Sequence, residues 1–346
     1  MPVYTIDPLS DPRWPEFVAC HPRSSIFHTS GWLAALRQAY GYVPIAYTTS
    51  PPGKELVNAF PFCRVETWLT SGRLVSLPFS DHCEPLVDGQ EDLALLLTAA
   101  EKDSRSSSLS YVELRPLHSL PPGGSHFTEA DSYVFHSLDL RPSLDQIYRN
   151  FHEDCVRRKI RRAERERLVC EVGNSETLLR AFYRLFVQTR KRHGLPPQPF
   201  GWFRALLASL GQSVRIYVAR RGDLAVAAIL TLTHPSGMFY KYGCSDPAFN
   251  SLGGTQMLFW NVIQIAKAEH CPLLDLGRSD CDDSGLITFK ERWGAARADL
   301  LYFRYSLRPS LQRGYYRQAK LARRLLTRFP PAFLSAAGRF LYRHMG

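Results

Sequence analysis

Two charged residues of opposite sign follow a short apolar run in the last third of the chain. The run LLDLG at residues 273–277 predicts a buried strand that carries Asp275 and then Arg278 to its end. A buried carboxylate without a partner is costly, so Asp275 is a candidate general base, a partner of Arg278, or a cap. Ligands of α/β proteins commonly bind where strands end, which makes both residues candidates for a site.

The elements just before this strand supply a second set of candidates. Tyr240 and Tyr242 alternate with Lys241 in a strand predicted over 237–243, where one face belongs to the core and the other can carry a phenol to a ligand. A glycine-bearing loop follows, and Thr255 is placed to cap a helix predicted over 255–269. The free N–H groups at a helix start suit an anionic group, although many α/β units have such a turn without a ligand.

A basic run connects the two halves of the chain. Its arginines and lysine meet only two glutamates, and on a helix Arg157, Arg161 and Arg165 share one face. Charge runs of this kind are often solvated helix faces. Arginine forks also match phosphate oxygens in pairs, so a phosphate clamp stays open as the second interpretation.

The first half has one dense ionisable cluster, Asp81-His82-Cys83-Glu84, directly after a predicted strand. Consecutive side chains on an extended loop point apart, and no second His or Cys group completes a shell, so we expect no metal here. His82 and Cys83 are neighbours in sequence and cannot readily face each other as a base and nucleophile. We therefore expect His82 to contact substrate or to fix its loop. The acidic group at 280–283 is interpreted as a polar loop.

Composition limits the compartment and the partners. The chain has 346 residues, a net charge of +11 and eight cysteines without a C-x-x-C spacing, which indicates reduced thiols and a cytoplasmic setting. The N-terminus has no basic segment followed by an apolar core, and no stretch of about 18 apolar residues occurs, so neither a signal peptide nor a membrane span is predicted. The positive charge favours an acidic partner, such as a phosphate group, a nucleic acid or an anionic membrane surface.

The predicted elements repeat in order. A helix, a strand meander, a second helix and two strands occur at 28–140 and again at 175–306, which predicts an α/β fold with mixed sheets in two halves, residues 1–145 and 146–307. Residues 308–346 form a basic tail with amphipathic helical periodicity, one apolar stripe lying on a helix at 311–329 and a second at Phe333, Ala337, Phe340 and Leu341. Such a tail can lie on an anionic bilayer or pack on the body of the protein.

The order of these motifs resembles a known family. Y-x-Y-G, a loop, a helix with W-x-x-x-x-x-A, then D-x-G-R-S and F-K-x-x-W-G-A before a strand resemble the FemAB-like, or BioF2-like, branch of the GNAT acyltransferase superfamily. The resemblance covers roughly residues 25–307. It implies two tandem GNAT-like halves, and it implies that Lys290 stabilises the oxyanion of acyl transfer, where one donor lowers the barrier by roughly 3–4 kcal/mol. It further implies that Arg157 and Arg161, in R-x-x-I-R-x-A, hold a diphosphate.

Three departures leave the acyl donor open. Arg115 stands where the peptidoglycan transferases of this branch often have an acidic residue before a proline. The chain has no heptad run for a coiled-coil tRNA arm. It also lacks the R/Q-x-x-G-x-G/A phosphate turn of typical GNAT proteins. Acyl-CoA is the expected donor, with aminoacyl-tRNA as the other candidate.

These observations predict an acyltransferase that moves an acyl or aminoacyl group to an amine, on a cell-envelope or exopolysaccharide precursor that carries phosphate and is lipid-linked or small. Lys290 and Asp275 are the expected catalytic residues, and the expected substrate contacts are Arg157, Arg161, Tyr240, Tyr242, Arg278 and His82. The alternative is a non-catalytic protein of the membrane surface that binds an anionic or lipid-linked polysaccharide precursor. Nucleic acid other than a donor tRNA is the least favoured partner. The expected location is the cytoplasm, with peripheral contact to the inner face of the membrane through the tail.

Overall fold

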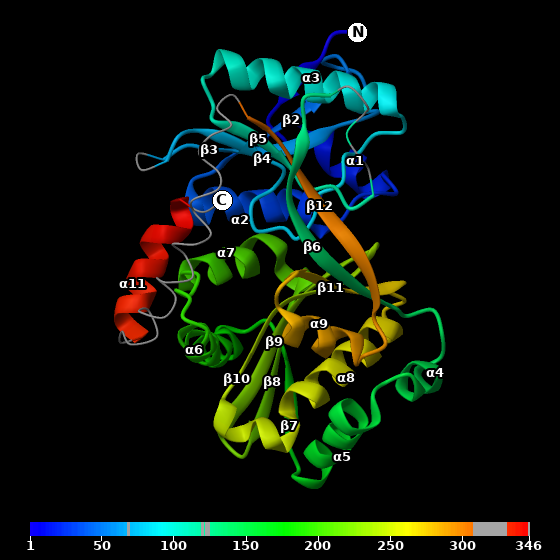
Figure 1. Cartoon of the computed structure of the whole chain (residues 1–346), viewed down its shortest axis with the longest axis vertical. Coiled ribbons are helices and arrows are strands. Elements are labelled where there is room, and N and C mark those ends of the chain that lie inside the picture. The colour runs from blue at the N-terminus through cyan, green and yellow to red at the C-terminus, as the bar shows by residue number, and fades with distance from the viewer. Residues whose placement is uncertain (68–69, 119–120, 122–124, 307–330, 345–346) are drawn as a thin grey trace.

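Two lobes, one above the other in Figure 1, are joined by two long strands that run from one into the other. The computed structural model describes the chain except for residues 68–69, 119–120, 122–124, 307–330 and 345–346. The predicted helix at 311–329 therefore lies outside the described residues. None of the described helices is both long and apolar enough to cross a bilayer.

The first half begins with a short strand and a helix and then follows the predicted order. Thr29 caps the second helix by accepting a hydrogen bond from the backbone of Trp32. The elements are β1 Tyr4–Ile6, α1 Trp14–Cys20, α2 Ser30–Tyr40, β2 Val43–Thr48, β3 Phe60–Val65, β4 Arg73–Val75, α3 Gln90–Ser106, β5 Tyr111–Leu114 and β6 Thr128–Asp139.

The second half starts with a short helix and with the basic junction, whose first turn is π-helical (Glu153–Arg157). Its elements are α4 Leu144–Arg149, α5 Arg158–Arg165, β7 Val169–Gly173, α6 Glu176–Arg192, α7 Phe200–Leu210, β8 Val214–Arg221, β9 Leu224–His234, β10 Gly237–Ser245, α8 Gly254–Ala268, β11 Leu273–Asp280, α9 Ser284–Glu291 and β12 Ala296–Ser306.

All twelve of these strands form one sheet, in the order β1-β2-β3-β4-β5-β12-β6-β11-β10-β9-β8-β7. In each half the fourth and fifth strands, β4 with β5 and β10 with β11, pair in parallel, and the other neighbours are antiparallel. The last strand of each half lies inside the sheet of the other, because β12 sits between β5 and β6 while β6 sits between β11 and β12. The predicted tandem architecture is confirmed, and this exchange joins what would otherwise be two sheets.

Several boundaries differ from the sequence prediction for identifiable reasons. β4 ends at Val75, whereas the apolar run from Arg73 to Phe79 predicts a longer strand, because Leu77 and Phe79 have positive φ angles outside the β region. β11 continues to Asp280, since its far end pairs with β6 of the other half. The polar loop expected at 280–283 is followed by an unpredicted helix, α9, which Asp283 caps through the backbone N–H of Leu286. The edge strand β7 was also not predicted, because its side chains are largely exposed.

The two lobes touch through α2 and α7. The indole rings of Trp32 and Trp202 meet edge to face with centroids 5.3 Å apart, and both side chains are fully buried. The two helices approach so closely that a Cβ atom added to Gly31 would lie 2.6 Å from the carbonyl oxygen of Ser209. Gly31 is therefore required for this interface by contact distance and not by backbone conformation.

The last described helix, α11 Pro331–Leu341, packs on the body of the protein. A Cβ atom on Gly338 would lie 2.0 Å from the carbonyl oxygen of Pro197, and the phenol of Tyr42 donates to the carbonyl oxygen of Tyr342 at 2.9 Å. The stripe expected from Phe333 and Phe340 is not the buried face, since both side chains are about half exposed whereas Leu334 is buried. Packing on the body is thus the outcome for this end of the tail.

We expect Gly31→Ala to destabilise the protein by about 1–3 kcal/mol, because the added methyl group overpacks the α2–α7 contact. Gly201→Ala is the matched control, as a Cβ atom there would meet nothing within 4 Å. Chemical denaturation should show a lower free energy of unfolding for the first variant and an unchanged or slightly higher one for the second. An unchanged free energy of unfolding in Gly31→Ala would contradict this, and would show that the lobes can move apart slightly without a loss of stability.

Candidate active site

A histidine of the first half and an aspartate of the second half meet at the centre of the molecule. His82 lies on the loop after β4, Asp275 lies on β11, and both are buried. Nε2 of His82 and Oδ2 of Asp275 are 2.7 Å apart, and the backbone N–H of Gly277 donates to Oδ1 of Asp275 at 2.6 Å. The pairing expected for Asp275 is therefore present, with His82 as the partner in place of Arg278.

Lys290 reaches the same point from α9. Its side chain is only 2% exposed, and Nζ donates to the carbonyl oxygens of Gly277 at 2.8 Å and Arg278 at 3.0 Å. Gly277 has a φ of +67°, which turns its carbonyl at a bulge of β11 and favours glycine. Burial lowers the pKa of Lys290 to about 8, and the carboxylates of Asp81 and Asp275 oppose this shift. Carbonyl oxygens hold the ammonium group, and no carboxylate of the described residues forms an ion pair with it.

A partly buried ion pair between the halves lies beside these residues and was not predicted. Nζ of Lys241 on β10 is 2.7 Å from Oδ2 of Asp81, and the phenol of Tyr302 donates to the carbonyl oxygen of Asp81 at 2.6 Å. Burial would raise the pKa of Asp81, but the Lys241 ammonium group outweighs it, with help from Arg278 and Lys290, and the pKa is lowered. A lysine in the middle of an apolar strand was the available signal in the sequence.

Simple alternation predicts that Tyr240 and Tyr242 share one face of the sheet, but they do not. The register between β10 and β9 shifts between these two residues, so Lys241 is an extra residue in a β-bulge. Tyr240 packs against Phe259 of α8, and Tyr242 accepts a hydrogen bond at 2.9 Å from the indole of Trp202 on α7. The bulge is what turns Lys241 toward Asp81.

The guanidinium group of Arg278 lies against two aromatic rings. It stands 4.1 Å from the ring centroid of Tyr133 on β6 and 5.1 Å from that of Tyr302 on β12. Among the described residues it forms no ion pair, although the nearby phenols and carboxylates raise its pKa despite burial. Arg278 is therefore connected to His82, Asp275 and Lys290 through β11, because it lies on the same strand as Asp275 and its carbonyl oxygen accepts a hydrogen bond from Lys290.

Arg157 and Arg161 are engaged elsewhere. Both guanidinium groups pair with Glu153, that of Arg157 at 2.6 Å, and no ion pair or hydrogen bond in the described part of the chain links either residue to Lys290. The junction does begin beside α9, because the backbone N–H of His152 donates to the carbonyl oxygen of Arg292 at 2.9 Å. A phosphate clamp at this junction stays a prediction.

Cys83 lies close to a histidine, but not to His82. Its sulfur is 3.6 Å from Nε2 of His28, and both side chains are buried. Burial raises the pKa of the Cys83 thiol well above its ordinary value and lowers that of His28 to about 4, so both groups are neutral near pH 7. This pair has the character of core packing and not of an activated nucleophile.

The first half has its own version of the Asp275 position. Glu113 on β5 stands opposite Val75 of β4, as Asp275 stands opposite Phe239 of β10. Glu113 accepts hydrogen bonds from Arg115 and Arg304, and although burial opposes the shift, these cations lower its pKa to about 2. Arg115, the departure noted in the sequence, is thus the partner that neutralises this carboxylate.

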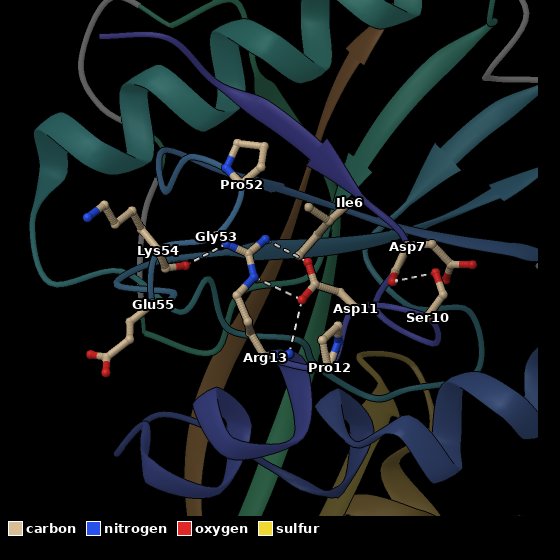
Figure 2. A pocket seen from close by; sticks show the side chains of 10 residues that line it. All are labelled: Ile6, Asp7, Ser10, Asp11, Pro12, Arg13, Pro52, Gly53, Lys54 and Glu55. Atoms are coloured by element: carbon tan, nitrogen blue, oxygen red, sulfur yellow. Dashed lines mark hydrogen bonds and ion pairs between the residues drawn. The ribbon is translucent and has the colours of Figure 1, made fainter.

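A pocket of about 550 Å³ lies on the first half, around the turn after β1 and the loop at 52–55. Figure 2 shows Arg13 at its wall, paired with Asp11 and bonded to the carbonyl oxygen of Lys54 at 2.6 Å. None of the predicted site residues lines it. Three of the predicted site residues, His82, Asp275 and Lys290, converge instead at β11, and we take this group as the candidate site.

Comparison with known proteins bears on this geometry. Residues 152–291 match the acetyltransferase (GNAT) domain, a segment that contains Asp275, Arg278 and Lys290. A UDP-N-acetylmuramoylpentapeptide-lysine N(6)-alanyltransferase of Weissella viridescens is 28% identical over 157 residues, which are 44% of this chain and 43% of the relative. The match thus spans less than half the length of that enzyme.

Solved structures support the fold over most of the chain. The crystal structure of FemX superposes with a TM-score of 0.70 at 14% identity, covering 89% of this chain and 98% of FemX. A tandem GNAT protein from the clavulanic acid biosynthesis pathway gives a TM-score of 0.55 at 12% identity, covering 89% and 99%. Together with the domain match, these comparisons confirm the resemblance to the FemAB-like branch.

The lowered pKa of Lys290 makes a stability prediction. Between pH about 8 and 10.5 the Lys290 side chain is less protonated in the native protein than in the unfolded chain. The free energy of unfolding therefore rises with pH across this window: the stabilising contribution of Lys290 is complete above pH 10.5 and is lost as the pH falls to about 8. The difference in unfolding free energy between wild type and Lys290→Met should rise with pH across this window, by roughly 1.4 kcal/mol per unit at the steepest. Denaturant titrations at several pH values measure it, and a flat difference would contradict the lowered pKa.

Proposed function

We propose that this chain, a protein of the FemAB-like GNAT fold, is an acyltransferase that moves an acyl or aminoacyl group to an amine on a cell-envelope or exopolysaccharide precursor. The observation that carries the proposal is the 2.7 Å contact between His82 and Asp275, which come from different halves. Lys290 is bonded to the carbonyl oxygens just after Asp275 on the same strand. A base candidate, its orienting carboxylate and a cation therefore converge on one point.

The residues fit the chemistry of acyl transfer. The acceptor amine nitrogen attacks the carbonyl carbon of a thioester or ester, the new C–N bond forms, and the C–S or C–O bond of the donor then breaks. Asp275 orients His82 through Nε2, which leaves Nδ1 to take a proton from the amine and return it to the leaving sulfur or oxygen. Lys290 has one N–H beyond the two held by carbonyl oxygens, and this donor is suited to the oxyanion.

The match to the muramoylpentapeptide-lysine alanyltransferase supports a phosphate-bearing acceptor, such as a nucleotide-linked or lipid-linked precursor. Arg157 and Arg161 are the proposed phosphate contacts, for which the carboxylate of Glu153 would have to give way. Tyr240 and Tyr242 remain proposed substrate contacts. The protein would act in the cytoplasm, at the inner face of the membrane when its acceptor is lipid-linked.

The donor decides between the two kinds of transferase. Incubation of the purified protein with an amine-bearing muramoyl pentapeptide precursor and either acetyl-CoA or alanyl-tRNA, followed by mass spectrometry, separates them. We expect a mass gain of one acyl group on the precursor with one of the donors. Binding of the precursor without any gain would favour the non-catalytic alternative.

We expect His82→Asn to lower kcat by about 10²–10⁴-fold with little change in KM, because it removes the base and keeps the loop's polarity. His126→Asn is the control, since His126 also pairs with a carboxylate, Glu101 at 2.9 Å, but on an exposed position. Steady-state kinetics on folded variants give the result. Unchanged turnover in the first variant would remove His82 from the mechanism.

Lys290→Met should lower kcat by about 10²–10³-fold through loss of the oxyanion donor. Lys267 offers a matched control, as its ammonium group also donates to two consecutive carbonyl oxygens, those of Leu140 and Arg141, at 2.6 and 2.8 Å. Lys267→Met should keep its activity. A similar loss in both variants would show that the effect is on stability and not on catalysis, and circular dichroism of each variant checks the fold.

A further inference from the structure

We propose that Arg278 is the receptor for an anionic group of the substrate, a carboxylate or a phosphate, bound next to Lys290. The inference rests on the proposed function in that it names the chemistry that this same site recognises. It is carried by the placement of the guanidinium group, by the partners of the neighbouring arginines, and by the way in which the surrounding charges are paired.

The guanidinium group is fixed by stacking. Its carbon lies 4.1 Å and 5.1 Å from the ring centroids of Tyr133 and Tyr302, and the two rings are themselves 4.8 Å apart. The phenol of Tyr302 is tied to the backbone of Asp81. Contact with ring faces leaves the in-plane N–H donors of an arginine unused, so this side chain is oriented without being satisfied.

The two neighbouring arginines on this part of the sheet, Arg115 and Arg304, both form ion pairs. Arg115 pairs with Glu113 at 2.7 Å, and Arg304 pairs with Glu113 and with Asp131 at 2.9 Å. Arg304 also lies over a tyrosine ring, that of Tyr111, at 5.1 Å. Within the described part of the chain, the guanidinium group of Arg278 donates no hydrogen bond and has no carboxylate within 4.0 Å. Stacking therefore accompanies ion pairing in Arg304 and replaces it in Arg278.

The charges around the site are unevenly paired: in the described part of the chain Arg278 has no carboxylate partner, whereas Lys241, Arg115 and Arg304 each have one. The positive groups are Lys241, Lys290, Arg115, Arg278 and Arg304, and the carboxylates are Asp81, Asp275, Asp283, Glu113 and Asp131. Each carboxylate has a close partner already, Lys241 for Asp81 and His82 for Asp275. Because a cation without a counter-ion in a partly buried site is costly, the guanidinium group of Arg278 is suited to pair with an anion.

The position of Arg278 connects this anion to the reaction. The backbone carbonyl of Arg278 accepts the hydrogen bond from Lys290, and Asp275 lies three residues earlier on the same strand. A substrate anchored by its carboxylate or phosphate at Arg278 would have its reacting group close to Lys290 and His82. The planar fork of arginine binds either anion with two parallel hydrogen bonds, which fixes orientation as well as position.

The test measures binding of acetate and of inorganic phosphate by calorimetry, with no turnover required. We expect wild type to bind at least one of them, and the preferred probe tells a carboxylate from a phosphate. Arg278→Lys keeps the charge but loses the planar fork, and it should weaken binding at least tenfold. Arg304→Lys, which changes a stacked arginine that is already paired, should bind as wild type does. Equal affinities in Arg278→Lys and wild type, or no binding by wild type, would overturn the inference.

Tyr133→Leu provides a second variant in case Arg278→Lys folds poorly. It leaves Arg278 in place but removes the ring at 4.1 Å, so binding should weaken although the charge is unchanged. Kinetics separate this inference from the proposed function. A raised KM with a nearly constant kcat in Arg278→Lys supports both. Anion binding that depends on Arg278 without any acyl transfer supports the inference alone, and transfer with an unchanged KM supports the function alone.

Discussion

The exchange of β6 and β12 is the constraint on which the rest of the molecule depends. Each strand completes the sheet of the half to which it does not belong, so neither half has a finished sheet by itself. The exchange extends β11 to Asp280 and places Tyr133 and Tyr302 beside Arg278. It also fixes the loop after β4 against β10 and β11, which is where His82 meets Asp275 and Asp81 meets Lys241. A site built from both halves requires such a rigid junction, because an error of about 1 Å between the groups is enough to weaken catalysis.

The two halves share one topology but carry different residues at equivalent positions. At the junction of the parallel strands, the first half has Glu113, which two arginines hold ionised and bonded. The second half has Asp275 at the corresponding place, and a histidine takes the position of the arginines. An arginine keeps its proton at any physiological pH, whereas a histidine can exchange one, so only the second arrangement can move a proton. The carboxylate position is thus structural in the first half, and only in the second half is it suited to proton transfer.

Local pattern was sufficient for most helices and strands and for several site residues. The predicted tandem order is confirmed in the sheet, whereas the cap predicted at Thr255 is wrong, because α8 begins after Gly253 without a side-chain cap. Motifs and residue types indicate Lys290, Asp275, Arg278 and His82 as candidates, and the structure brings them together. The site roles of Arg157 and Arg161 stay predictions. Their ion pairs with Glu153 could not be predicted from the sequence. Lys241 was missed because a β-bulge, which depends on the pairing of β10 with β9, changes the face of every residue after it.

By itself the sequence determined the kinds of element, the order in which they repeat, and the residue types able to support acyl transfer, because periodicity, capping and motif spacing act over a few residues. Only the tertiary structure decided which charges are neutralised. Asp275 pairs with His82 from 193 positions away, and Asp81 pairs with Lys241 from 160 positions away. Such partners come together through the strand exchange and the packing of α2 on α7, and no short stretch of sequence encodes a contact between groups so far apart. Burial and charge pairing follow from those contacts; they lower the pKa of Lys290 and, among the residues that the structure describes, leave Arg278 without a carboxylate partner.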